Sequence, residues 1–102
     1  MKMYIVLKES IPLGIAVNAV WHSILAAHKK WEQEPEYQEW LNKSFKKATC
    51  IANDKEFEAL KKDGKFIVIT ESALNHQEVA LIFYPLEKDQ GPKGLRFLRL
   101  LK

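Results

Sequence analysis

The stretch Ile11–Trp31, IPLGIAVNAVWHSILAAHKKW, organises the rest of the chain. Apolar residues recur in it at spacings of three and four, which predicts a helix from Ile15 to about Lys30, entered through a Pro-Leu-Gly turn. Two side chains in the apolar run are polar enough to do chemistry, Asn18 and His22. They are four residues apart, so a helix places them on one face, one turn from each other.

Short apolar runs on either side of this helix predict strands, and shorter periodic segments predict two further helices. The expected strands are Met3–Lys8, Ala48–Ala52, Lys65–Thr70 and Val79–Tyr84, and the expected helices run from Pro35 to near Phe45 and from Lys55 to Lys62. This order predicts an α/β domain over residues 1–102, with helices on both faces of a small mixed sheet. The crossovers imply parallel pairings, and the short Thr70–Val79 connection fits an antiparallel hairpin. Periodicity leaves the tail LRFLRLLK open between a strand and a helical turn.

Composition limits the classes of protein that this chain can belong to. The single cysteine, Cys50, rules out an internal disulfide and gives no metal-ligand spacing, which favours a cytoplasmic location. We expect it to be an inert thiol inside a strand. No run approaches the roughly 18 apolar residues of a membrane span, so we expect no membrane partner. The net charge of +3 is uneven, and basic residues gather at 43–47 and 93–102. Such clusters can attract the phosphates of RNA, or they can simply keep a surface soluble.

Several segments, in order and spacing, resemble the type II peptidyl-tRNA hydrolases. These are the opening strand YIVLK, the loop IPLG, the helix with His22 eight residues beyond Gly14, and the closing tail LRLLK. Pro35-Glu36-Tyr37 and the pair Tyr84-Pro85 make the chain most similar to the divergent branch of peptidyl-tRNA hydrolase domain-containing proteins. The resemblance implies a three-layer α/β/α fold with a four-stranded mixed sheet, often as a homodimer. It also implies cleavage of the ester between peptide and tRNA, without a metal or cofactor.

The resemblance also suggests which residues form the site. Active members carry a lysine, a glutamine and a histidine on the first helix, and here the first two positions are Ile15 and Ala19, so only His22 matches. Glu71 falls near the acidic position that follows the third strand in the family. We therefore expect His22 as the acid–base residue, supported by Asn18 and Glu71, with weak turnover or none. The expected substrate-binding residues are an anion seat at Gly14 and basic side chains for tRNA phosphates: Lys46, Lys47, Arg96 and Arg99.

Three alternatives remain open at this point. His22 could be a partly buried histidine bonded to a backbone carbonyl. The fold could serve as a non-catalytic module that binds RNA or protein, or as a small homodimer with a pocket for a small molecule. We expect the aromatic residues Trp21, Trp31, Tyr37 and Trp40 to lie mostly in the core, although one of them beside lysines could stack on a base or form a dimer face.

Overall fold

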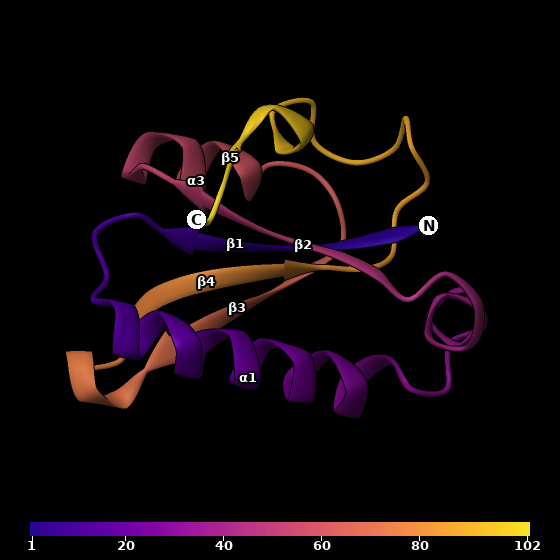
Figure 1. The fold of residues 1–102 in the computed structure, drawn as a ribbon, viewed down its shortest axis with the longest axis horizontal. Coiled ribbons are helices and arrows are strands. Elements are labelled where there is room, and N and C mark those ends of the chain that lie inside the picture. Colours follow the sequence, from indigo (N-terminus) through magenta and orange to yellow (C-terminus); the bar gives the residue numbers. More distant parts are fainter.

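Five strands form one mixed sheet in the computed structural model, which describes residues 1–102 (Figure 1). They are β1 (Lys2–Lys8), β2 (Lys46–Ala52), β3 (Phe66–Glu71), β4 (Gln77–Phe83) and β5 (Arg99–Leu100), in the spatial order β3-β4-β1-β2-β5. The prediction of an α/β domain with a mixed sheet is confirmed. The expected count of four strands is wrong, because two residues of the tail add β5 to the edge of β2.

Only one neighbouring pair in the sheet is parallel. β1 and β2 run side by side in parallel, in register from Lys2 opposite Lys46 to Lys8 opposite Ala52. The hairpin of β3 and β4 is antiparallel, as its short connection predicted. The segment between β2 and β3 does not produce a second parallel pair, because β3 lies at the far edge and pairs only with β4. The apolar centre of β1 is buried on both faces, which explains why its sequence lacks alternation.

Helices cover both faces of the sheet (Figure 1). The long helix α1 (Leu13–Trp31) lies across β3 and β4 on one face. The helix α3 (Asp54–Leu60) and the short turn η3 (Leu95–Phe97) lie on the other face, where Leu95 packs with Phe57. The helix α2 (Pro35–Glu39) continues into a π-helical turn, η1 (Trp40–Ser44), and the turn η2 (Ser72–Leu74) joins β3 to β4. No helix is both long enough and apolar enough to cross a membrane.

The sequence explains both ends of α3. The Asn53 side chain accepts a hydrogen bond from the Glu56 backbone N–H at 2.8 Å, and Glu56 accepts one from the Asn53 N–H at 2.9 Å. This reciprocal capping satisfies two amides that the first helical turn leaves free. At the other end the helix stops at Leu60, and the turn that follows contains Gly64, which adopts a left-handed φ of 94°. Between these ends the helix buries Phe57 and Leu60 against the sheet.

Helix α1 contacts the sheet with its small residues rather than its large ones. The buried side chains of its central turns are Ala16, Ala19, Ser23 and Ala27. The buried Ser23 hydroxyl has a hydrogen-bond partner, because it donates to the Ala19 carbonyl at 2.7 Å. Five large apolar side chains of α1 are exposed: Leu13, Val17, Trp21, Ile24 and Leu25. The last residue of the helix, Trp31, is the exception and is 1% exposed. The expectation of a core position is therefore right for Trp31, Tyr37 and Trp40 and wrong for Trp21.

Candidate functional site

His22 and Asn18 lie in the middle of α1, and both are exposed. Neither side chain makes a hydrogen bond or an ion pair with the rest of the protein. The alternative of a half-buried imidazole bonded to a carbonyl is therefore wrong. The ring is open to water and to ligands, but no group of the protein fixes its orientation or its tautomer.

Glu71, the expected partner of His22, is used locally instead. It ends β3 and caps the turn η2, where one carboxylate oxygen accepts a hydrogen bond from the Ala73 backbone N–H at 3.2 Å. Its second oxygen, Oε2, is buried without a hydrogen-bond partner. No hydrogen bond or ion pair joins Glu71 to His22 or Asn18. The structure thus supplies an accessible base but no carboxylate in contact with it, which is a poor arrangement for general acid–base catalysis.

Gly14 is the second residue of α1, and its surroundings are open. A Cβ added to it would meet nothing within 4 Å, so no close backbone approach requires a glycine here. The first turn of α1 contains no acidic residue. This helix end is available to an anion, but nothing else in the structure points to a ligand there.

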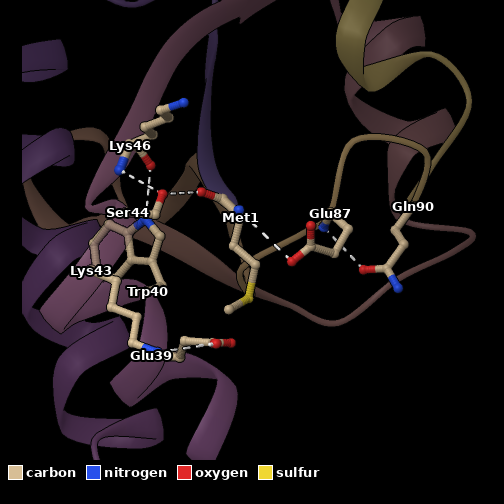
Figure 2. A network of polar contacts seen from close by, with 8 residues as sticks. All are labelled: Met1, Glu39, Trp40, Lys43, Ser44, Lys46, Glu87 and Gln90. Carbon is tan, nitrogen blue, oxygen red and sulfur yellow. Dashed lines mark hydrogen bonds and ion pairs between the residues drawn. The ribbon is translucent and has the colours of Figure 1, made fainter.

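Lys46 and Lys47 begin β2 beside an exposed aromatic ring, and we call Phe45, Lys46 and Lys47 the junction surface. The Lys47 ammonium lies 3.2 Å from the centroid of the Phe45 ring and donates a hydrogen bond to the Phe45 carbonyl at 2.9 Å. The Lys46 side chain has no partner and extends away from the neighbouring polar network (Figure 2). Neither ammonium meets a carboxylate, but that of Lys47 is held against the Phe45 ring and carbonyl, so only the Lys46 ammonium is free of contacts.

The backbone under the junction surface is held in an unusual conformation. Phe45 has a φ of 53°, in the left-handed region that bulky residues rarely adopt, at a typical cost of about 1–3 kcal/mol. The Trp40 indole donates to the Lys46 carbonyl at 2.8 Å, and the Lys46 N–H donates to the Ser44 hydroxyl at 3.3 Å (Figure 2). The Ser44 hydroxyl in turn donates to the carbonyl of Met1. These bonds tie η1 to the first residue of β2 and to the N-terminal residue.

The two arginines of the predicted site are neutralised by acidic side chains. Arg96 belongs to the turn η3, on the face of the sheet opposite to α1 (Figure 1). Its Nη1 atom lies 3.4 Å from Oδ1 of Asp89. Arg99 pairs with Glu9 at 2.9 Å and with Glu56 at 3.7 Å. The predicted phosphate-binding residues therefore separate into two lysines without acidic partners and two arginines with acidic partners. The arginines do not adjoin the face of α1 that carries His22.

Cysteine chemistry does not contribute to this site. Cys50 is buried in β2, as expected, and burial raises the pKa of its thiol, which the positive charge of Lys2 offsets only in part. At neutral pH the group is a thiol and not a nucleophilic thiolate. Nowhere do three or more His, Cys, Asp or Glu side chains gather as metal ligands.

The sequence reasoning missed a second surface, an apolar groove between α1 and β2. The groove has a volume of about 410 Å³, and its lining comes from α1, from β2 and from the C-terminal tail: Ala16, Val17, Val20, Trp21, Ile24, Thr49 and Leu101. Helical periodicity did indicate large apolar residues on α1, but it could not say that the sheet would take the alanine face. The available signal was the number of apolar residues, which exceeds what one buried face can hold.

Compared with known proteins, the chain matches no protein-family model and no curated sequence. Its function is therefore argued from its own residues and their geometry.

Proposed function

We propose that this protein is a non-catalytic RNA-binding module on a scaffold like that of the type II peptidyl-tRNA hydrolases, with tRNA as its ligand class. The observation that carries the proposal is the junction surface. Two lysines without acidic partners, Lys46 and Lys47, stand beside the half-exposed ring of Phe45.

This combination fits single-stranded nucleic acid. Unpaired ammonium groups displace counterions from phosphates, and an exposed aromatic ring can stack on a base of any sequence. Base–aromatic stacking is typically worth about 1–3 kcal/mol for each base. The strained left-handed backbone at Phe45 also supports a ligand site, because such strain clusters where a side chain must be presented in a fixed direction.

Titration of the protein with tRNA at two salt concentrations tests the proposal. Binding should weaken steeply as salt rises, and replacing both Lys46 and Lys47 by alanine should reduce the salt slope by about 2. Phe45→Asn should weaken binding at both concentrations with little change in the slope, because asparagine tolerates the left-handed backbone but cannot stack. Arg96→Ala is the matched control and should leave binding unchanged. Absence of binding at low salt would remove RNA from the possible ligands.

Slow ester hydrolysis is the second candidate function, and the accessible ring of His22 is the observation that favours it. A histidine near neutrality can deprotonate water even without a fixed partner, although much less effectively. If the protein cleaves an N-blocked aminoacyl-tRNA, His22→Ala should abolish cleavage and leave the fold intact. His76→Ala, another exposed histidine, serves as the control. Equal rates in the parent and His22→Ala would exclude the hydrolase assignment.

We also propose that the functional unit is a homodimer. Five large apolar side chains lie exposed along one helix, which is unusual for a protein that acts alone. The mass of the protein in solution, measured by light scattering, tests this directly against the 11.9 kDa of one chain.

A further inference from the structure

We infer that a second copy of this chain covers the exposed apolar side of α1, with Trp21 of each copy entering the groove between α1 and β2 of the other. The inference rests on the proposed homodimer and adds the surface, the symmetry and the central residue. We call the exposed large side chains of α1 the α1 stripe: Leu13, Val17, Trp21, Ile24 and Leu25.

The α1 stripe is large enough to be considered as a dimer surface. Leu13, Trp21 and Leu25 are 72%, 65% and 56% exposed, and Val17, Ile24 and the adjoining Leu101 extend the patch. The largest apolar patch on a typical monomer covers roughly 300–600 Å². A patch at the upper end of that range, covered completely on two copies, would bury about 1,200 Å² in total, the lower limit for a stable and specific interface.

The groove beside the stripe exists because α1 is placed off-centre on the sheet. The helix packs mainly on β3 and β4 and covers the same face of β2 only in part, where Ile51 packs near Ala16 and Ala19. On that face Thr49 and Ile51 are only half-buried, since β2 alternates its side chains between the two faces. The small side chain of Ala16 on one wall and Thr49 on the floor leave the 410 Å³ groove, which can admit an indole ring.

The patch is therefore complementary to itself. It carries a large exposed ring, Trp21, at the rim of an apolar hollow whose smallest lining residues are Ala16 and Thr49. A two-fold axis places the same patch on both partners, so each projection meets the other copy's hollow. An aromatic side chain in a pocket at the centre of an apolar patch is the typical anchor of a protein interface.

Charge also favours a second copy as the occupant. The segment from Leu13 to Ala27 contains no Asp, Glu, Lys or Arg. Two identical helices can therefore face each other without like charges in contact, which would otherwise oppose a symmetric pair. The same lack of charge gives the stripe no means to steer a charged partner of another kind.

The dimer would complete the open site on α1. Asn18 lies three residues before Trp21, and His22 lies three residues before Leu25, so each polar side chain adjoins the stripe on the helix surface. A copy seated on the stripe would supply the second wall that the exposed face around His22 lacks.

The experiment compares the mass of the parent protein with those of two charged variants over a concentration series, by sedimentation and light scattering. The parent should have twice the 11.9 kDa mass of one chain, and Trp21→Glu should have the mass of one chain. Phe97→Glu is the matched control and should stay dimeric, because Phe97 is 76% exposed on the turn η3, on the opposite face of the sheet. Val17→Glu repeats the test at a second position of the stripe and replaces Trp21→Glu if that variant fails to fold.

Fluorescence gives a readout on the unaltered protein. Trp31 and Trp40 are 1% and 4% exposed, so quenching by acrylamide reports mainly Trp21. Quenching should be weak at high concentration and should increase on dilution as the dimer dissociates. A parent that is monomeric up to millimolar concentration would refute both the dimer and this interface. A dimer that survives Trp21→Glu and Val17→Glu would refute the interface alone, and the homodimer would then use another surface.

Discussion

The two helices on opposite faces of the sheet use their apolar residues in opposite ways. Helix α3 has seven residues and buries its large side chains, with Phe57 at 0% and Leu60 at 4% exposure. Helix α1 has nineteen residues, buries mainly alanines, and leaves Trp21 and Leu25 outside. The fold therefore buries the apolar side chains of α3, whereas much of the apolar surface of α1 stays exposed to solvent. The exposed apolar residues of α1 are therefore candidates for an interface rather than for the core.

Replacing the central residue of α3 should have the largest effect on stability. Phe57→Ala removes a fully buried ring between the helix and β1, and it should lower the free energy of unfolding by about 3–5 kcal/mol. Trp21→Ala, the matched change on α1, should alter the free energy of unfolding by about 0.5 kcal/mol or less when the chain is monomeric. Urea unfolding at low protein concentration measures both. Similar losses in the two variants would mean that α1 and α3 do not differ in this way.

A larger side chain on the buried alanine face of α1 should destabilise the protein less than Phe57→Ala does. This change also tests the contrast between the buried and the exposed residues of the two helices. Ala19 is fully buried against the sheet, in a cluster with Leu7 and Val79. Ala19→Leu adds three carbons to a site without space, so we expect a loss of about 1–3 kcal/mol in the free energy of unfolding. Leu25→Ala removes the same atoms from the exposed face and should be nearly neutral in the monomer. Thermal unfolding of the two variants, each checked for monomeric mass, decides whether only small side chains fit between α1 and the sheet.

Ion pairs stabilise the C-terminal end of α3, and removing them should have the smallest of the three effects on stability. Lys61 pairs with Glu58 at 2.8 Å and also with Glu78. The hydrogen bond from Lys61 lowers the pKa of Glu58 below its usual value, and hydrogen bonds to Glu58 and Glu78 raise the pKa of Lys61. The Glu58 contribution is present above pH 4.5 and is lost as the pH falls through the lowered pKa. The Lys61 contribution is present below pH 10.5 and is lost as the pH rises through the raised pKa.

Lys61→Met tests this pH dependence. The stability difference between the parent and the variant should be greatest across the neutral range and should shrink in strong acid and in strong alkali. Urea unfolding at several pH values measures the difference. A difference that stays constant at all pH values would show that Lys61 acts through the packing of its alkyl chain rather than through its charge.

The elements were predictable because local signals agree with the fold. The apolar run of β1 and the periodic segment of α3 stood in the sequence, and each element lies within a few residues of its expected bounds. The parallel pair and the hairpin followed from the lengths of the connections. Strand β5 could not be predicted, because two residues carry no periodicity and pairing with β2 alone makes them a strand.

The candidate site was less predictable, because it depends on which side of α1 faces the sheet. Periodicity placed Asn18 and His22 on one face, but it could not reveal that Glu71 would cap its own turn. Nor could it show that Lys46 and Lys47 remain unpaired while Arg96 and Arg99 meet carboxylates, since ion pairs join residues as distant in sequence as Glu9 and Arg99. The choice between the alanine face and the Trp21 face is a matter of shape, which hydrophobicity alone does not resolve.

The short strand β5 also determines how safely the chain can be shortened. It pairs with Cys50 and Ile51, and the Leu101 N–H donates to the Thr49 carbonyl at 2.9 Å, so the tail occupies the outer edge of β2. A chain ending at Leu98 would leave these backbone groups free along an apolar strand, which is a template for strand addition by another molecule. We therefore expect removal of the last four residues to increase aggregation, and a fused sequence is better attached beyond Lys102 than in place of it.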